Sequence, residues 1–292
     1  MDSVAASTSV TVRPLDQPAE MRAGVELYRE VLELGPTAPA VSPRLLWALR
    51  RNGGSVIGAF EGERLVGFAY GFVGKDATSG EVYHYSQAAV VHPQCQGRGI
   101  GRALKFGQRA YVLDTGITRM RWSYDPVRAG NGHFNLDVLG ARARWFVPNL
   151  YGVEDMGRDP GHPSDRLIVE WDLAGPPTPP AVDAVPAAFA AAAAGRTTRV
   201  PARLPGWGEL LHEGTDVLIG IPRSWSDVAR DADRAGQLRA TVSTAFARTL
   251  GQGYVAVSCR AADSDSAWYR LRPASAGITP LGPKPGERTE RP

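Results

Sequence analysis

Cysteine is scarce in this 292-residue sequence: only Cys95 and Cys259 occur, and they lie far apart in the chain. Two distant thiols give no support to a disulfide framework or to a zinc site, so we expect no metal. Long apolar runs are also missing, and none approaches the ~20 residues that a membrane-spanning helix needs. The first residues lack the basic stretch followed by an apolar stretch that marks a secretory signal. We therefore expect a cytoplasmic protein without a membrane partner.

Lysine is almost absent, because Lys75, Lys105 and Lys284 are the only lysines among 33 basic residues. The arginines that make up the rest are scattered, whereas a nucleic-acid-binding face usually concentrates its positive charge in a stripe. The net charge of +3 is modest. These features argue against a nucleic-acid partner and favour small anionic ligands. A hydrophobic content of 43% is ample for a folded core.

The most informative stretch is a glycine-rich loop, residues 94–101, with the sequence Gln-Cys-Gln-Gly-Arg-Gly-Ile-Gly. A strand-like apolar run, residues 86–91, precedes it, and residues 100–114 follow with apolar residues mostly at helical spacing. Glycines allow a tight turn whose N–H groups approach a ligand closely. The first turn of the following helix adds unpaired N–H donors and a partial positive charge, while Arg98 and Arg102 add full charges. This arrangement predicts a cradle for a phosphate or pyrophosphate.

Three phosphate-binding motifs compete for this loop. The dinucleotide fingerprint needs three glycines at a spacing that Gly97, Gly99 and Gly101 do not have, and the Walker loop needs a Gly-Lys-Ser/Thr ending that is missing here. The third motif, Gln/Arg-x-x-Gly-x-Gly/Ala, fits Gln96, Gly99 and Gly101. It is the acyl-CoA loop of the GNAT acyltransferase superfamily, which this stretch resembles. The alternative is a tight strand–helix turn that binds nothing.

The order of the expected elements extends this resemblance. They are, in order, a strand at 10–13, helices at 16–35 and 42–51, strands at 55–60, 65–73 and 81–91, a helix at 100–114, a strand at 119–124, a short helix around 134–139, and strands at 142–151 and 166–173. The order β-α-α-β-β-β-α-β-α-β-β is that of the GNAT fold, so the resemblance covers residues 10–173. It implies an α/β (α+β) domain whose central mixed sheet is splayed between its fourth strand, 81–91, and its fifth, 119–124.

A second ordered part is expected nearer the C-terminus, after an Ala- and Pro-rich linker at residues 174–205. Its predicted elements are a strand at 216–221, a helix at 224–250, and strands at 254–261 and 268–271. A β-α-β-β unit of this size, residues 206–273, buries too little surface to be stable alone, so we expect it to dock on the GNAT domain. Residues 1–9 and 274–292 are expected to be disordered.

The two-part arrangement resembles a narrower group of GNAT proteins, most of them uncharacterised. That group carries the segments Asp-Pro, Asn-x-His-x-Asn-Leu-x-x-Leu-Gly-Ala, Asn-x-Tyr-Gly and Gly-x-Pro-Ser-Asp-Arg-Leu. Here these segments are residues 125–126, 131–141, 149–152 and 161–167. Some members are linked to enzymes that acylate amino acids with succinyl-CoA, so the resemblance implies amino-acid N-succinylation as one candidate reaction.

The resemblance also implies a co-substrate, which is acetyl-CoA or another acyl-CoA. In the family, backbone donors of the loop and the free edge of the preceding strand hold this molecule. The residues expected to bind it here are Ala89, Val90, Val91, Gln96, Gly97, Arg98, Gly99, Ile100, Gly101 and Arg102.

The proton carriers depart from the family pattern. GNAT enzymes often place a Glu or His base nine or eleven residues before the first residue of the loop motif, and these positions are Gln87 and Tyr85 here. His84 is expected to point to the opposite face of the strand. Leu136 stands where many members carry a catalytic Tyr. The candidate catalytic residues are Tyr85, Gln87, Asp125 and His133, with Tyr151 or water as a further substitute for the general acid.

Acceptor recognition is assigned to four polar residues, Asn131, Asn135, Tyr151 and Arg166. The guanidinium of Arg166 suits a substrate carboxylate, because its fork geometry matches two oxygens. Each assignment has a structural alternative. Asp125 also suits a helix cap, and Asn131 and Asn135 suit the fixing of a loop. Arg166 also suits an ion pair with Asp165 or Glu170.

The leading hypothesis is an acyl-CoA-dependent N-acyltransferase that moves an acetyl, succinyl or similar group to the amine of a small molecule, with an amino acid as one candidate. One alternative is an acyltransferase that uses a carrier-protein donor or a hydroxyl acceptor. Another is a non-catalytic module that binds acyl-CoA. Docking of the C-terminal unit in trans, which would give a homodimer, also stays open.

Overall fold

The computed structural model describes residues 9–35, 37–153, 161–175, 201 and 203–274. The ends that were expected to be disordered and most of the expected linker lie outside these residues. The chain divides into two compact units, residues 1–74 with 84–118 and residues 75–83 with 119–292. Within the described ranges, no helix is both long enough and apolar enough to cross a membrane.

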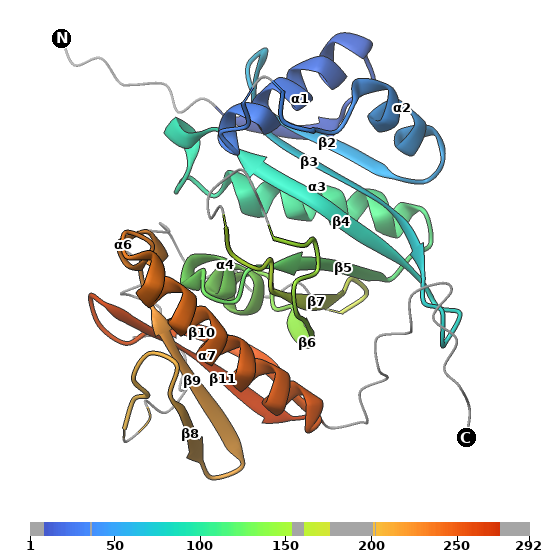
Figure 1. Ribbon diagram of the computed structural model, residues 1–292. Coiled ribbons are helices and arrows are strands. Elements are labelled where there is room, and N and C mark those ends of the chain that lie inside the picture. Colours follow the sequence, from blue (N-terminus) through green and yellow to red (C-terminus); the bar gives the residue numbers. More distant parts are fainter. Residues whose placement is uncertain (1–8, 36, 154–160, 176–200, 202, 275–292) are drawn as a thin grey trace, which may run out of the picture. The chain divides into compact units, whose positions relative to one another are not determined.

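The described residues of the first unit form four neighbouring strands and three α-helices (Figure 1). Its elements are β1 (Val10–Pro14), α1 (Pro18–Val31), α2 (Pro43–Arg51), β2 (Ser55–Glu61), most of β3 (Arg64–Lys75) and of β4 (Val82–Val91), the 3-10 turn η1 (Pro93–Cys95) and α3 (Ile100–Asp114). The strand order is β1-β2-β3-β4, and β2 pairs antiparallel with both β1 and β3.

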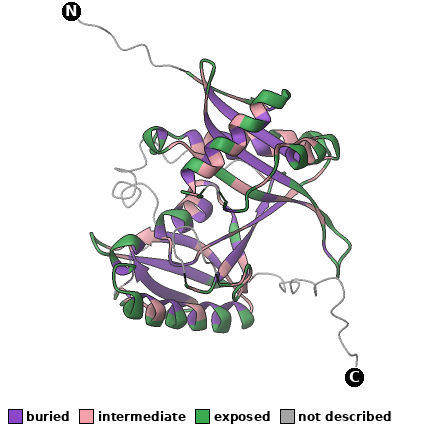
Figure 2. Cartoon of the chain, turned by 45° about the horizontal axis from the view of Figure 1, so that its top comes forward, coloured by how far each residue is buried: buried purple, intermediate pink, exposed green. Residues whose placement is uncertain are grey.

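Strand β2 is buried on both faces, because helices cover both sides of this sheet. The neighbouring residues Val56 and Ile57 point to opposite faces and belong to two different apolar clusters. Val56 lies in the cluster that contains Leu46 of α2, and Ile57 lies in the cluster that contains Leu104 of α3. Strand β2 is buried over residues 55–60, whereas β1 and β4 also carry half-buried and exposed residues (Figure 2). Helix α3 is therefore fixed against the sheet by packing along its length.

The described residues of the second unit form seven neighbouring strands in the order β5-β7-β6-β10-β11-β9-β8. Its elements are β5 (Arg119–Tyr124), α4 (Ala129–His133), the π-helical turn η2 (Phe134–Val138), β6 (Arg142–Val147), β7 (Arg166–Asp172), β8 (Leu210–Glu213), β9 (Asp216–Pro222), α6 (Trp225–Val228), α7 (Ala232–Gly251), β10 (Tyr254–Ala261) and β11 (Ser266–Pro273). The recorded pairs in this sheet are antiparallel.

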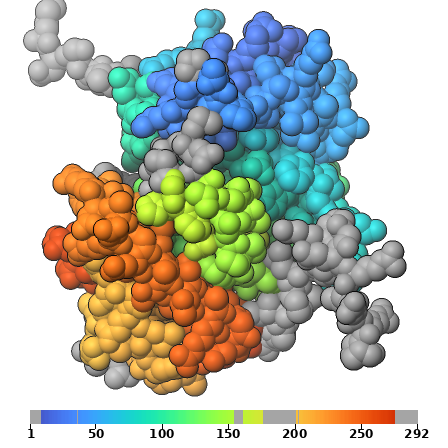
Figure 3. All heavy atoms as spheres, in the orientation of Figure 1, coloured from blue at the N-terminus to red at the C-terminus, as the bar shows by residue number. Residues whose placement is uncertain are grey.

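Strand β10 lies beside β6, with Ala256 opposite Ala143, so this sheet combines strands from distant parts of the chain. Helix α7 packs on the same sheet through Phe246, which stacks on Phe146 at 6.5 Å and meets the Tyr269 ring edge-on at 5.0 Å between ring centroids. In the space-filling view the orange surface of α7 adjoins the lime-green surface around β6 (Figure 3). A shared aromatic core therefore joins residues 119–173 to residues 207–273.

Gly132 of α4 makes a close approach possible. A Cβ atom at this position would lie 2.5 Å from the hydroxyl oxygen of Tyr269 and 2.9 Å from the Sγ atom of Cys259. The Tyr269 hydroxyl donates to the carbonyl oxygen of Pro126 at 3.0 Å. Only a residue without a side chain leaves room for this hydrogen bond.

Arg121 of β5 is the centre of a buried ion-pair network in the second unit. Its guanidinium lies 3.0 Å from Asp76 and 2.8 Å from Glu170. The backbone N–H of Ser79, followed by Arg121, lowers the pKa of Asp76 to about 2. The network ties residues 75–83 to this unit, because the carboxylate of Asp76 pairs with the buried guanidinium of Arg121.

The element order expected for residues 10–173 is confirmed, and so is the mixed α+β class. The expected helix at 224–250 is wrong, because the chain breaks at residues 229–231 into α6 and α7. Asp231 caps α7 by accepting a hydrogen bond from the N–H of Arg234 at 3.1 Å, which gives the new helix its own start. The sequence analysis also missed β8, a strand of only 4 residues that pairs with β9.

A chain truncated after Leu173 tests how far the first 173 residues depend on the remainder. We expect it to unfold at lower urea concentration and to associate, because removal of β10 exposes the edge of β6 and removal of α7 uncovers Phe146. Urea unfolding and size-exclusion chromatography measure both effects. A chain ending at Ala274 keeps every described element and serves as the control. Residues 1–173 that are as stable and monodisperse as this control would contradict the prediction.

Candidate functional site

The glycine-rich loop joins β4 to α3, and contacts of its first residues hold it against the sheet. Cys95 is buried in the same apolar cluster as Ile100 and Leu104 of α3, which anchors the loop on the sheet. The side-chain amide of Gln96 donates to the carbonyl oxygen of Val91 at 3.0 Å. Gln96 thus closes the loop on the last residue of β4.

Two glycines in this loop adopt left-handed backbone conformations, with φ of 76° at Gly97 and 79° at Gly99. A Cβ atom at Gly99 would meet nothing within 4 Å, so the backbone conformation rather than space requires glycine there. Gly99 caps α3 and accepts a hydrogen bond from the N–H of Ala103 at 3.0 Å. The N–H groups of the first turn have no intrahelical partner and are available to an anion.

The two arginines of the loop have different surroundings. The exposed Arg98 pairs with Glu61 of β2. Arg102, in the first turn of α3, is half-buried with its guanidinium 4.4 Å from the centroid of the Phe106 ring. Both charges lie at the positive end of the α3 dipole, where they add to its attraction for an anion.

Strand β4 presents two different faces. Tyr85, Gln87 and Ala89 lie on the more exposed face, and Tyr85 is 5.4 Å from the ring of Phe72. His84 and Ser86 lie on the buried face, as the alternation of a strand requires. Tyr85 and Gln87 are therefore accessible within the first unit, and their catalytic roles stay predictions.

The buried face of β4 carries a polar chain that the sequence analysis did not find. Ser86 accepts a hydrogen bond from Lys105 at 2.7 Å and donates to Gln108 at 2.8 Å. Gln108 donates to Ser55 at 2.8 Å, and the Ser55 hydroxyl lies 2.8 Å from Nε2 of His84. Every member is buried. The signal in the sequence was a lysine inside an apolar helical stripe, in a chain with only three lysines.

Asp125, which follows β5, has a partner far along the chain. Its carboxylate accepts a hydrogen bond from the N–H of Val127 at 3.1 Å, so the capping alternative describes one of its contacts. It also accepts two hydrogen bonds from Arg239 of α7, at 2.9 and 3.3 Å. The guanidinium of Arg239 lies 4.5 Å from the ring centroid of Trp225. Because both side chains are largely buried, this pair fixes the position of Asp125.

His133 and Asn135 are buried, and Asn131 is exposed. Nδ1 of His133 lies 3.1 Å from the carbonyl oxygen of Cys259. Oδ1 of Asn135 accepts a hydrogen bond from the indole N–H of Trp122 at 3.1 Å. The structure brings His133 and Asn135 into contact with the sheet, and their predicted roles in catalysis and acceptor binding stay predictions.

Tyr151 and Arg166 lie together, with the Arg166 guanidinium 5.5 Å from the centroid of the Tyr151 ring. The Tyr151 hydroxyl is 3.0 Å from Oγ of Ser123. The carboxylate of Asp165 accepts hydrogen bonds from the N–H of Asn149 and the hydroxyl of Ser243 on α7. Arg166 itself donates to the backbone carbonyl of Asp165 at 3.1 Å.

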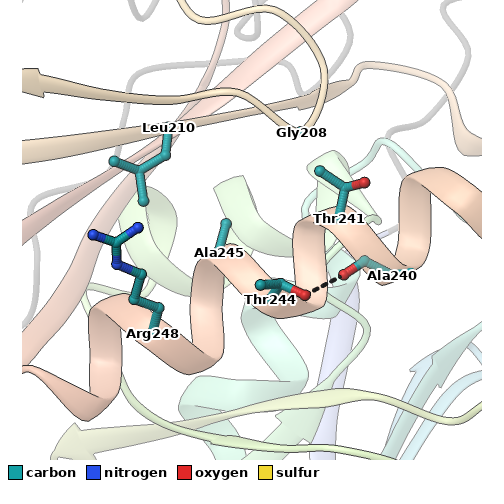
Figure 4. Close-up of a pocket in the computed structure, with 7 residues that line it drawn as sticks. All are labelled: Gly208, Leu210, Ala240, Thr241, Thr244, Ala245 and Arg248. Carbon is teal, nitrogen blue, oxygen red and sulfur yellow. Dashed lines mark hydrogen bonds between the residues drawn. The ribbon is translucent and has the colours of Figure 1, made fainter.

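A hollow of about 420 Å³ lies on the second unit between α7 and the segment that leads into β8 (Figure 4). Its lining residues are Gly208, Leu210, Ala240, Thr241, Thr244, Ala245 and Arg248. The hydroxyls of Thr241 and Thr244 donate to carbonyls of their own helix, at Gln237 and Ala240. The hollow therefore presents little convergent chemistry, and none of the predicted site residues lines it.

Comparisons with known proteins find one family model that matches part of the chain. Residues 23–129, just over a third of the chain, match the model of the Acetyltransferase (GNAT) family. A comparison with curated proteins finds no match.

Solved acetyltransferase structures are similar at low identity. The structure of yncA, a putative acetyltransferase from Salmonella typhimurium with acetyl-CoA, is 22% identical at a TM-score of 0.45, over 57% of this chain and 97% of that one. A phosphinothricin acetyltransferase from Sinorhizobium meliloti in complex with AcCoA is 21% identical at a TM-score of 0.45, over 58% and 94%. The ribosomal-protein-S18-alanine N-acetyltransferase from Escherichia coli is 17% identical at a TM-score of 0.43, over 57% and 96%.

The family match includes the whole glycine-rich loop together with β4 and α3, which supply its flanking strand and helix. Residues 23–129, which include this loop, are therefore similar to the GNAT acetyltransferases described by that family model.

Proposed function

We propose that the chain transfers an acyl group from an acyl-CoA to the amine of a small molecule. The observation that carries this proposal is the loop at residues 96–101, with its two left-handed glycines at the start of α3. First-turn N–H groups without an intrahelical partner, the helix dipole and two arginines are features that suit a pyrophosphate. Acetyl and succinyl are the candidate acyl groups, and an amino acid is a candidate acceptor.

The residues of the loop fit the co-substrate by shape as well as by charge. The side of Gly99 where a Cβ atom would point is open, so the backbone can come close to a phosphate. We assign the pyrophosphate to residues 96–102, and the pantetheine arm to the backbone edge of residues 89–91. The thioester supplies the activated acyl carbon when acyl-CoA is bound. Backbone N–H donors at such a site stabilise a developing oxyanion without reorganisation.

Transfer of the acyl group also requires removal of a proton from the ammonium group of the acceptor. Tyr85 and Gln87 lie on the exposed face of β4, and neither is a ready base near neutral pH. The position at which many family members carry a tyrosine acid is occupied here by the buried Leu136, which cannot transfer a proton. We assign proton transfer to Tyr85, Tyr151 or water.

The second unit is proposed to recognise the acceptor. Arg166 is its candidate for a substrate carboxylate, with Tyr151 stacked on its guanidinium. Asn131 and Asn135 are the remaining candidates for acceptor contacts. Residues 206–273 are proposed to be integral to this function, because Arg239 holds Asp125 and Ser243 holds Asp165, the residue before Arg166.

Binding of acyl-CoA without turnover is the second candidate function. The observation that favours it is Leu136, together with the lack of a carboxylate or imidazole at Tyr85 and Gln87. A panel of acyl-CoA esters and amines, with free thiol as the readout, separates the two candidates. Thiol release that depends on an amine supports transfer, whereas tight CoA binding with no release on any amine supports the binding module.

Gly101→Glu tests the loop. It places a carboxylate at the start of α3, and because Gly101 is helical the new side chain brings no left-handed strain. We expect CoA affinity to fall at least a hundredfold at unchanged stability, as judged by calorimetric titration and thermal unfolding. Gly35→Glu adds the same charge where a Cβ atom meets nothing within 4 Å, and it should bind CoA like wild type. A folded Gly101→Glu protein with wild-type CoA affinity would rule out this site.

Arg239→Met tests the buried ion pair with Asp125. The substitution removes both hydrogen bonds of Arg239 from a largely buried carboxylate and leaves Arg128, at 3.9 Å, as its cationic neighbour. We expect this loss to lower the free energy of unfolding by about 3–5 kcal/mol. Asp125→Asn in the same chain should restore much of that loss, because no charge is then left alone. Arg248→Met, at an exposed position of the same helix, should cost less than about 0.5 kcal/mol. Equal losses for the two single variants in urea unfolding would show that the pair is unimportant.

A further inference from the structure

In the buried polar network of the first unit, each hydrogen bond points the same way, from the donor side chain to the next member. Lys105 donates to Ser86, Ser86 donates to Gln108, and Gln108 donates to Ser55. Since the Ser55 hydroxyl already accepts from Gln108, its own hydrogen is available to Nε2 of His84. This series of hydrogen bonds therefore begins at the ammonium group of Lys105 and ends at the imidazole of His84, and each hydroxyl in it both accepts and donates.

The hydrogen-bond series cannot relay a proton from one end to the other. Gln108 accepts with its carbonyl oxygen and donates with its amide nitrogen, so passage of a proton would convert the amide to its imidic acid form. The series instead fixes positions. Its first bond joins Lys105 of α3 to Ser86 of β4, the two elements that flank the glycine-rich loop.

Lys105 lies close to the N-terminus of α3. It is five residues after Ile100, which corresponds to about 7.5 Å along the helix axis. Long side chains on a helix lean toward its N-terminus, so the ammonium group is nearer to that end than the Cα atom is. A unit charge about 10 Å from an anion, at an effective dielectric constant of about 20, changes the binding constant on the order of tenfold.

The surroundings of Lys105 bring its pKa into the neutral range. Burial lowers the pKa of Lys105 to about 7. Burial, followed by the charge of Lys105, lowers the pKa of His84 to about 4, so the imidazole contributed by β4 stays neutral at that pH. Ser55 from β2, Ser86 from β4 and Gln108 from α3 do not titrate. Arg102 and Arg109 are the charged residues one turn before and one turn after Lys105 on α3.

We propose that Lys105 is a positioning residue for the phosphate subsite: it holds α3 on β4 through Ser86, and it takes up a proton from solvent when the pyrophosphate of CoA binds at the N-terminus of α3. This inference rests on the proposed binding of CoA to the loop. An anion at the helix start stabilises the ammonium form, and by linkage the ammonium form binds the anion more tightly. Lys105 contacts no ligand atom and acts through helix position and charge.

Calorimetric titration of the full chain with CoA, in phosphate and in Tris buffer from pH 6.5 to 9, measures both the affinity and the protons taken up. A tenfold coupling raises the pKa of Lys105 by about one unit, which gives an uptake of about half a proton per CoA near pH 7.5. The 3′-phosphate of CoA also titrates, near pH 6 as phosphomonoesters do, so the difference from a matched variant is decisive.

Lys105→Met is that variant, and Lys75→Met is the control because Lys75 is exposed. We expect Lys105→Met to lose the half proton and to bind CoA about tenfold more weakly at pH 6.5, with little loss at pH 9. Lys75→Met should match wild type at every pH. Ser86→Ala keeps the ammonium group, so it should retain the proton uptake even where the helix is less well held.

Stability without ligand tests the titration separately. Lys105 is protonated up to pH ~10.5 in the unfolded chain, but only up to about pH 7 in the folded chain. The unfolded state therefore binds more protons between these values, and the free energy of unfolding should rise with pH across this window. Lys105→Met should flatten that rise.

Three results would overturn the proposal. Equal CoA affinity and proton uptake in wild type and Lys105→Met, at every pH, would overturn it while the proposed function survives. An equal rise of stability with pH in both proteins would overturn it as well. Failure of wild type to bind CoA at all would overturn the proposed function and this inference together.

Discussion

The carboxylate of Asp125 lies largely inside the second unit and depends on a guanidinium that enters the chain 114 residues later, at Arg239. A charge placed there is stable only if its partner is in place, because removal from water costs several kcal/mol. Other acidic groups of the unit follow the same rule. Asp137 accepts hydrogen bonds from the hydroxyl of Ser258 and the N–H of Cys259, and Asp165 accepts one from Ser243. The segments after β5 and before β7 therefore take their positions from α7 and β10.

The glycine-rich loop is built on a different principle, and it was readable from the sequence for that reason. Its determinants are local, because two glycines allow left-handed backbone and the following helix supplies the donors. None of these features needs a residue from elsewhere in the chain. The element order was readable on the same grounds, since periodicity and caps act over a few residues.

What the sequence did not reveal was mostly the identity of distant partners. Nothing near Asp125 points to Arg239, and nothing near Ser86 points to Lys105 or Ser55, because hydrophobic periodicity says which face is buried and not what meets it. The break between α6 and α7 was missed for another reason. The apolar residues on the two sides of residues 229–231 keep almost helical spacing, and the Asp231 cap was not recognised inside that pattern.

Gly132 has a consequence for how sequences with this architecture can change. The hydroxyl of Tyr269 occupies the volume that a side chain at position 132 would need. A larger residue at 132 therefore fits only where the residue at 269 is smaller. Glycine at 132 is required only where an aromatic side chain from 269 packs against it. Positions 132 and 269, which are 137 residues apart, should therefore covary in related sequences. Such covariation would reveal this contact from the sequences alone.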